Sequence, residues 1–170
     1  MQQKIQVDFG DHKEERKMPF FDSMFTEPRN PIIYKGNLVY PGEFIDGPKK
    51  FKAKITVIST NSKYRQGISF YMFGMKGTIT YRGETRKRNG FSFWADEIDD
   101  ELTLDIDIKE GTLWFGNFCD NTGTGSRVSG FSGFAMMIED IGENKKRYYC
   151  NDWEPDEDFD DLIFDVEFIE

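Results

Sequence analysis

Hydrophobic and polar residues alternate with a period of two along much of this 170-residue chain. FKAKITVIS, residues 51–59, places apolar side chains on one side and mostly lysine and threonine on the other. ELTLDIDIK, residues 101–109, repeats the pattern, but its polar side is largely acidic. Because the side chains of a β-strand point to alternate faces, both segments predict half-buried strands. The expected inward-facing residues are Phe51, Ala53, Ile55, Val57, Leu102, Leu104, Ile106 and Ile108.

Other segments rich in β-branched and aromatic residues stand between Gly, Asn, Asp and Pro residues and predict further strands. GISFYMFGM, residues 67–75, is so apolar that it predicts a strand buried on both faces. Asn89-Gly90 predicts a tight hairpin, since a type I′ turn needs positive φ at both central residues. Glu110-Gly111 predicts a second hairpin. The remaining expected strands are IQVDF, NPIIYKGNLVY, GTITYRGE, FSFWADE, TLWFGNF, FSGFAMMIE and KRYYC.

The acidic end of the chain, EPDEDFDDLIFDVEFIE, combines charge with a regular apolar pattern. A flexible acidic tail is the alternative to a strand here, but it would not need a large apolar residue at every second position. We therefore expect an acidic loop over residues 151–161 that leads into a terminal strand over residues 162–169. The alternating large residues of that strand are Leu162, Phe164, Val166 and Phe168.

These segments define the expected fold class. Roughly nine to ten strands can be counted, and no segment keeps the 3.6-residue period of an amphipathic helix over about eleven residues. A chain of 170 residues is typical of one domain with a sizeable core. We expect a single, mainly antiparallel all-β domain over residues 1–170, folded as a sandwich or a partly open barrel with little helix.

Composition narrows the class of protein. No apolar run approaches the ~18 residues that cross a membrane as a helix, and the N-terminus lacks the apolar region of a secretory signal. We therefore expect a cytoplasmic protein whose two cysteines, Cys119 and Cys150, are buried thiols rather than a disulfide. The only histidine is His12. That scarcity argues against a structural zinc site and against Ser-His or Cys-His catalysis.

The acidic stretch partly fits a calcium-binding loop. Asp156, Asp158 and Asp160 have the spacing of the first three ligands, and Glu167 falls at the twelfth position. However, Asp161 occupies the position where the sharp turn of such a loop needs glycine. The more economical interpretation is a charged loop that leads into a strand, with no metal and no other cofactor.

Two further patterns have the residue types of catalytic or phosphate sites. Asp105 and Asp107 lie on one strand face about 7 Å apart, a separation found between the carboxylates of inverting glycosidases. The loop DNTGTGSRVSG, residues 120–130, is glycine-rich and carries Arg127, but a phosphate-binding loop opens a helix and this one precedes a strand-like segment. We interpret the acids as the solvent-exposed face of a strand and the loop as a contact loop, so no enzyme activity is expected.

The net charge of −9 is unevenly distributed. Residues 1–46 carry a net −2, residues 47–90 carry +10, and residues 91–170 carry −17. One interpretation is that the basic and acidic blocks neutralise each other across a sheet. The other is that one block is a docking surface, because summed charge determines which partners are attracted.

The favoured hypothesis is a non-enzymatic adaptor or inhibitor, of the immunity or nucleic-acid-mimic type. It would dock a basic protein, such as a nucleic-acid enzyme, through the acidic C-terminal half. The expected partner-binding residues are Asp96, Glu97, Asp99, Asp100, Asp105, Asp107, Asp156, Asp158, Asp160 and Asp161.

The alternative hypothesis is a single-stranded nucleic-acid-binding protein that uses the basic, aromatic-rich block 47–94, with the acidic C-terminal segment for partners. Such proteins combine a cationic groove with aromatic rings on which bases stack. The residues expected to bind are Lys50, Lys52, Lys54, Tyr64, Tyr81, Arg86, Lys87 and Arg88. A third possibility is a carbohydrate or other small ligand held by exposed tryptophan, with Trp94, Trp114 and Trp153 as the candidates.

Overall fold

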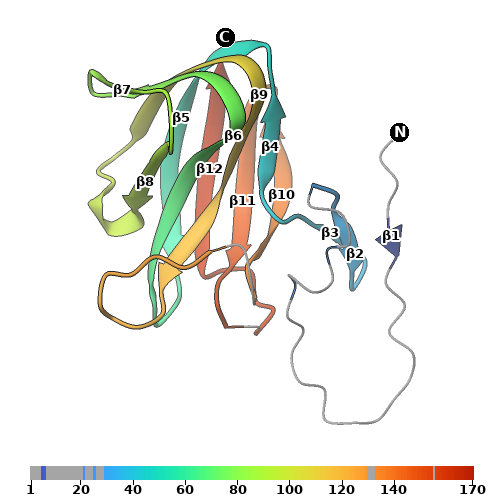
Figure 1. Cartoon of the computed structure of the whole chain (residues 1–170). Helices are drawn as coiled ribbons and strands as arrows, with labels where there is room; N and C mark the ends of the chain where they lie inside the picture. Colours follow the sequence, from blue (N-terminus) through green and yellow to red (C-terminus); the bar gives the residue numbers. More distant parts are fainter. Residues whose placement is uncertain (1–4, 7–20, 22–24, 26–28, 130–132, 155) are drawn as a thin grey trace, which may run out of the picture.

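The computed structural model describes residues 5–6, 21, 25, 29–129, 133–154 and 156–170. These residues form a mostly antiparallel β structure with little helix, which confirms the expected fold class. Two layers of strands pack face to face, and the described strands do not close into a barrel (Figure 1). No helix among the described residues has the length and apolar character needed to cross a membrane.

The main sheet contains nine strands in the order β10-β11-β12-β5-β9-β6-β7, with β4 also paired to β9 and β8 also paired to β6. A short 3-10 helix, η1, follows β8. A smaller sheet has the order β1-β2-β3. The elements are β1 (Ile5–Gln6), β2 (Ile32–Tyr34), β3 (Asn37–Val39), β4 (Glu43–Asp46), β5 (Lys49–Thr60), β6 (Arg65–Tyr81), β7 (Glu84–Arg86), β8 (Phe91–Trp94), η1 (Ala95–Glu97), β9 (Leu102–Asp120), β10 (Ala135–Gly142), β11 (Lys145–Asn151) and β12 (Leu162–Ile169).

Strands β6 and β9 are long enough to belong to both layers. The first half of β9 pairs with β5, whereas its second half pairs with β4. Strand β6 pairs with β9 along most of its length, with β8 near its start and with β7 near its end. The first layer therefore contains β10, β11, β12, β5 and β7, the second layer contains β4 and β8, and β6 and β9 pass from one to the other (Figure 1).

Strand β9 runs without interruption through Glu110-Gly111, so the hairpin expected there is wrong. Its pairing with β6 is irregular between Phe73 and Gly77, where a bulge bends the two strands. Gly111 has φ +82°, and a Cβ on it would lie 2.4 Å from the carbonyl oxygen of Gly74. The glycine is therefore required by the bend that takes β9 from the first layer into the second, not by a turn.

The core lies between the two layers. Phe115 of β9 contacts Phe70 of β6 and Tyr148 of β11, with ring centroids 5.1 Å and 5.3 Å apart. Tyr148 in turn stacks on Phe164 of β12 at 4.9 Å. None of these four rings is more than 1% exposed. The inward-facing residues expected on β5 and β9 also lie in this core, with Val57 at its margin.

The expectation that residues 67–75 form a strand buried on both faces is wrong. In β6, Ile68 and Phe70 face the core, but Tyr71 and Phe73 are 43% and 54% exposed. No strand of the described part of the chain lies over this stretch of the second layer, and the outward-facing rings are in contact with solvent.

The hairpin assigned to Asn89-Gly90 is also wrong. Both residues have the expected positive φ, but β7 and β8 each pair with β6 rather than with each other. The turn between β6 and β7 is formed by Arg82-Gly83, which also has positive φ at both residues. Asn89-Gly90 instead belongs to the connection that returns the chain to the second layer.

Strand β12 spans the residues expected for the terminal strand and lies between β11 and β5. Leu162, Phe164 and Val166 are fully buried. Asp165 faces the other side of the strand, yet it is 3% exposed because the Arg147 guanidinium covers it and donates to it at 2.7 Å and 3.1 Å.

The smaller sheet covers part of the first layer. Its strands β2 and β3 come from NPIIYKGNLVY and meet at the turn Lys35-Gly36, where both residues have positive φ. Of the segment IQVDF, only Ile5–Gln6 lies among the described residues. A second apolar cluster joins this sheet to β10 and to the β11–β12 loop; its buried members are Phe21, Ile32, Tyr34, Val39, Ala135 and Phe159.

Candidate functional site

The basic and acidic blocks meet on the outer face of the first layer. Lys50 stands opposite Asp107, and Lys52 stands opposite Asp105, because β5 and β9 are neighbours. Lys52 Nζ lies 3.2 Å from Asp105 Oδ1, and Asp107 is paired along its own strand with Lys109 at 2.9 Å. Asp105 and Asp107, the carboxylates considered for glycosidase chemistry, are therefore each paired with a lysine. The Lys52–Asp105 pair is a contact of the kind expected if the basic and acidic blocks neutralise each other across the sheet.

The acidic residues around η1 divide into two groups. Asp96 and Glu97 both accept hydrogen bonds from Arg65, at 2.8 Å and 2.7 Å. Asp99 and Asp100 are exposed, and neither has an ion pair with any described residue. Of these four expected partner-binding residues, the second pair alone presents uncompensated charge.

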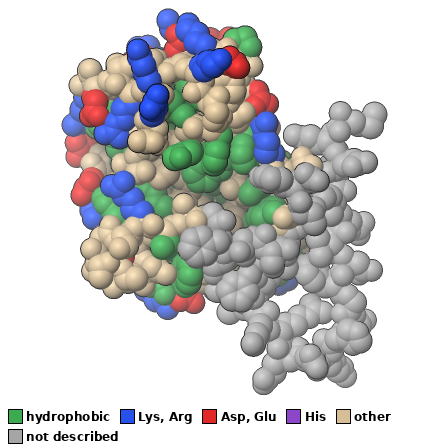
Figure 2. All heavy atoms as spheres, viewed as in Figure 1, with side chains coloured by type: hydrophobic (Ala, Val, Ile, Leu, Met, Phe, Trp, Pro, Cys, Tyr) green, Lys and Arg blue, Asp and Glu red, His purple; other side chains and the backbone are tan. Residues whose placement is uncertain are grey.

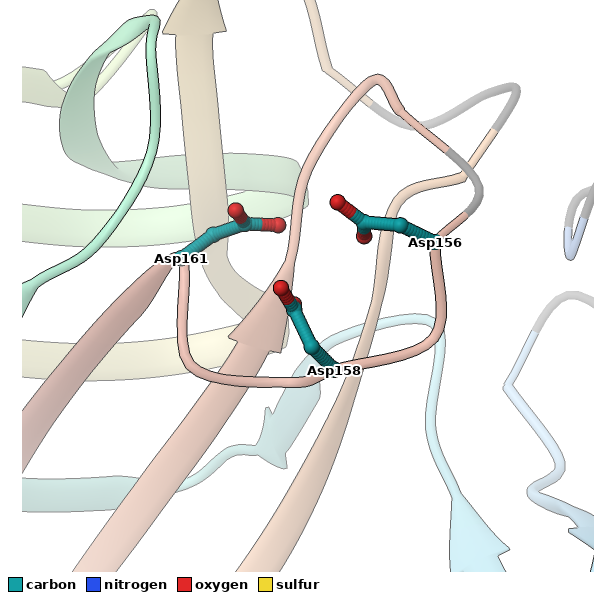
Figure 3. Close-up of side chains that lie close together, drawn as sticks. All are labelled: Asp156, Asp158 and Asp161. Carbon is teal, nitrogen blue, oxygen red and sulfur yellow. The ribbon is translucent and has the colours of Figure 1, made fainter.

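The β11–β12 loop brings three carboxylates together. The side-chain oxygens of Asp156, Asp158 and Asp161 lie within 4.8 Å of one another (Figure 3). Asp161 is 2% exposed; burial, followed by the nearby Asp152 carboxylate, raises its pKa to about 8. Burial also raises the pKa of Asp156 and of Asp158. Like charges this close favour either a shared proton or a bound cation.

The spacing of a calcium-binding loop is only partly reproduced. Asp160 lies outside the cluster and accepts a hydrogen bond from Asn61 Nδ2 at 2.8 Å. Glu167 lies on β12, opposite Lys54 of β5. Asp161, at the expected glycine position, instead supplies a carboxylate. The three clustered residues could hold a divalent cation, but calcium takes six to eight oxygen ligands and would need others.

The outer face of the second layer carries a row of aromatic side chains. Phe44 of β4 stands opposite Trp114 of β9, which stands opposite Tyr71 of β6. Phe73 follows on the same side of β6, and its ring centroid lies 4.9 Å from that of Tyr71 and 6.5 Å from that of Trp114. We call Phe44, Tyr71, Phe73 and Trp114 the aromatic face. Figure 2 shows hydrophobic side chains gathered over this part of the molecule, with Lys and Arg side chains above them.

Two glycines hold the Trp114 indole against the sheet. A Cβ on Gly42 would lie 2.0 Å from Trp114 Nε1, and a Cβ on Gly116 would lie 2.6 Å from Trp114 Cζ2. The ring therefore occupies the space that any side chain at these positions would fill. The indole therefore lies close to backbone at both positions, and it is only half-buried, so part of the ring is accessible to a ligand.

Two cations without ion-pair partners among the described residues lie just before Gly90, which contacts β6 at the aromatic face. Gly90 lies against the backbone of β6, since a Cβ on it would be 3.2 Å from Tyr71 Cα. Lys87 and Arg88, just before it, are exposed and form no ion pair with any described residue. Arg86, by contrast, already has partners: its guanidinium lies 4.0 Å from the centroid of the Phe91 ring and is paired with Glu84.

The other basic and aromatic residues expected to bind nucleic acid are scattered. Lys52 and Lys54 are paired with acids of β9 and of the segment before it. The Tyr64 hydroxyl donates to Glu154 at 2.6 Å, and Tyr81 packs on Phe93 at a centroid distance of 4.9 Å. Lys50 has no ion pair among the described residues but lies on the first layer, and the structure therefore does not assemble these residues into one surface.

Sequence reasoning missed Phe44, Tyr71 and Phe73. A signal was present, since Ser69, Tyr71 and Phe73 fall on one side of a period-two strand and the serine is polar. Assigning that side to solvent required knowing which strands lie next to β6.

The backbone N–H groups of the glycine-rich loop donate to the carboxylate of Asp120, a residue of the same loop. Asp120 accepts hydrogen bonds from the backbone N–H groups of Thr122, Gly123 and Gly125, at 3.1 Å, 2.9 Å and 2.6 Å. Burial raises the pKa of Asp120, but these hydrogen bonds outweigh it and hold the pKa below its usual value. The N–H groups that a phosphate cradle would offer are thus already used, and strand β10 follows the loop as expected.

Both cysteines are free and buried. Burial raises the pKa of the Cys119 thiol to about 12 and also raises that of Cys150, so neither is suited to act as a nucleophile at neutral pH. Comparisons of the chain with protein-family models, with curated proteins and with solved structures find no match.

Proposed function

We propose that this protein binds single-stranded nucleic acid in the cytoplasm, with the aromatic face as the surface on which bases stack. The observation that carries the proposal is the row of Phe44, Trp114 and Tyr71 across three adjacent strands, extended by Phe73. Every base has a flat aromatic surface, so rings of this kind bind single strands with little dependence on sequence.

The contrast between the two outer faces supports this choice of surface. The first layer presents alternating charges that pair with one another, as Lys52 does with Asp105. The second layer presents aromatic rings instead: Tyr71 and Phe73 are its most exposed large apolar side chains, whereas the Arg29 guanidinium lies over the Phe44 ring at 5.1 Å from its centroid. Contiguous exposed apolar groups on a folded protein mark binding surfaces more often than isolated ones do.

Local charge supports an anionic ligand. Lys87 and Arg88 precede Gly90, which contacts the backbone at Tyr71, and they have no carboxylate partners among the described residues. Arg29, which lies over the Phe44 ring, is balanced by Asp46. The net charge of −9 repels nucleic acid at long range. Binding therefore has to rest on these local cations and on stacking, so affinity should respond to both.

Fluorescence anisotropy of labelled oligo-dT, titrated with the protein at ~50 mM and ~200 mM salt, tests the proposal. Micromolar or tighter binding that weakens at the higher salt is expected. Tyr71→Ala and Phe73→Ala should each weaken it, whereas Ile58→Ala should not, because Ile58 is an equally exposed apolar residue (45%) on β5. No binding at either salt, or equal losses in all three variants, would refute the proposal.

A second candidate function is the docking of a basic protein, as an adaptor or inhibitor. The observation in its favour is that Asp99, Asp100, Asp156 and Asp158 are exposed without a cation partner among the described residues. Such a surface accelerates association with a basic partner and makes it strongly salt-dependent.

Two variants that each remove four carboxylate charges, from different parts of the surface, test this second function. One variant replaces Asp99, Asp100, Asp156 and Asp158 with Asn; the control replaces Asp96, Asp105 and Asp107 with Asn and Glu97 with Gln. Binding of a labelled lysine decamer should weaken in the first variant and much less in the control. Equal weakening would mean that net charge alone attracts the peptide, and the docking surface would be refuted.

A further inference from the structure

A second aromatic pair lies on the same outer face, nearer the start of β6. Trp94 of β8 and Phe118 of β9 both stand opposite Gly67 of β6. A Cβ on Gly67 would lie 2.2 Å from Phe118 Cζ, so the phenyl ring rests directly on the strand backbone. The Trp94 and Phe118 rings meet edge to face at 4.7 Å. Both side chains are almost fully buried, and arginine side chains cover them.

Two arginines cover this pair, and they differ in what else they contact. Arg65 lies 4.4 Å from the Trp94 ring centroid, but its N–H groups are held by Asp96 and Glu97. Arg127 lies 5.8 Å from the Trp94 centroid and 5.5 Å from that of Phe118. Arg127 is exposed, and it makes no hydrogen bond or ion pair with any described residue.

The backbone holds Arg127 in place. Its neighbour Val128 exchanges two backbone hydrogen bonds with Cys119 of β9, each 3.0 Å long. The preceding turn is tied down by the Asp120 carboxylate. A guanidinium stacked on rings keeps its edge N–H groups available, and those groups match the oxygens of a phosphate in pairs.

We propose that Arg127 is a phosphate-binding residue that extends the aromatic face, an inference that rests on the proposed function. Gly67, beneath Arg127, is four residues from Tyr71 along β6, which is roughly 13 Å at ~3.3 Å per residue. Nucleotides of a stacked strand advance by about 3.4 Å each, so this separation spans at most about four of them. A strand with one base stacked at Trp114 and Tyr71 therefore brings a later phosphate to Arg127.

The test compares Arg127→Gln with Arg82→Gln. Arg82 is a matched control, because it too is exposed, lies 5.3 Å from the centroid of a ring, that of Tyr81, and has no carboxylate partner among the described residues. Both variants and the wild type are titrated with labelled dT10, and unlabelled dT2 is used as a competitor that reaches the aromatic face alone. Arg127→Lys keeps the charge but loses the paired donors.

Arg127→Gln is expected to weaken dT10 binding roughly ten-fold, to lower the slope of log K against log salt by about 0.7, and to leave dT2 competition unchanged. Arg127→Lys should recover part of the affinity, and Arg82→Gln should match the wild type. If Arg127→Gln and Arg82→Gln bind dT10 equally, or if Arg127→Gln weakens dT2 as much as dT10, the phosphate site is refuted while the proposed function stands. Failure of the wild type to bind dT10 refutes both.

Discussion

Gly116→Ala removes no side chain that could contact a ligand, yet it should disable the aromatic face. The added Cβ would lie 2.6 Å from Trp114 Cζ2 and 3.0 Å from Cη2. Carbon atoms pack at about 3.5–4.0 Å, so the indole has to tilt away from the sheet by about 1 Å. Gly116 does not have a positive φ, and alanine at this position therefore causes no backbone strain.

The size of the effect follows from where the ring sits. Trp114 is half-buried at the surface and can move outward, so the free energy of unfolding should fall by less than the ~1–3 kcal/mol that overpacking costs in a closed core. Stacking of a base on an aromatic side chain contributes ~1–3 kcal/mol. Loss of one flat stacking surface should thus reduce affinity for oligo-dT by roughly 5- to 150-fold.

The assay is oligo-dT anisotropy at one low salt concentration, with thermal unfolding measured on the same samples. Gly142→Ala is the control, because a Cβ there meets only Lys145 Cβ at an ordinary 3.4 Å. Full affinity in Gly116→Ala, with a folded protein, would show that a flat Trp114 is not needed and would refute the reasoning.

Three further predictions concern stability. Phe115→Ala should lower the free energy of unfolding by ~3–5 kcal/mol in urea denaturation, because the ring is 1% exposed and joins the two layers; a loss below ~1 kcal/mol would contradict the described core. The raised pKa of Asp161, about 8, means that the folded protein keeps a proton that the unfolded chain releases near pH 3.9, so stability should fall as pH rises from about 4 to about 8. Asp161→Asn should flatten that slope while Asp99→Asn leaves it unchanged, and the reverse result in thermal melts would contradict the assigned burial. Deletion of residues 162–170 removes β12 from between β11 and β5 and should abolish cooperative melting, whereas a wild-type melting temperature would contradict its place in the sheet.

Local alternation was enough to predict β5, β12 and the fold class. In FKAKITVIS and DLIFDVEFI, each strand has one apolar side, and a period of two can be read without knowing its neighbours. The same reasoning failed at β6, where both sides are apolar. Ile68 is buried and Tyr71 is exposed because one side of the strand faces the core and the other side faces solvent.

The candidate site depended on contacts between residues far apart in the sequence. The charge blocks suggested two docking surfaces, but the pairing of β5 with β9 places Lys52 beside Asp105 and balances much of that charge. Phe44, Tyr71 and Trp114 are separated by at least 27 positions, and only the sheet order brings them into one row. At Gly111 the sequence correctly indicated a residue with positive φ. Glycine favours both turns and bulges, so the sequence did not show that this glycine bends a continuous strand rather than forming a hairpin turn.

The most direct test of the aromatic face is the indole N–H resonance of Trp114 in a ¹⁵N-labelled sample titrated with oligo-dT. The account predicts that this resonance moves progressively with added oligo-dT, while that of Trp153, in the β11–β12 loop, stays in place. A Trp114 resonance that does not move when anisotropy reports binding, or that of Trp153 moving in its stead, would contradict the account, because the strand would then be bound elsewhere on the molecule.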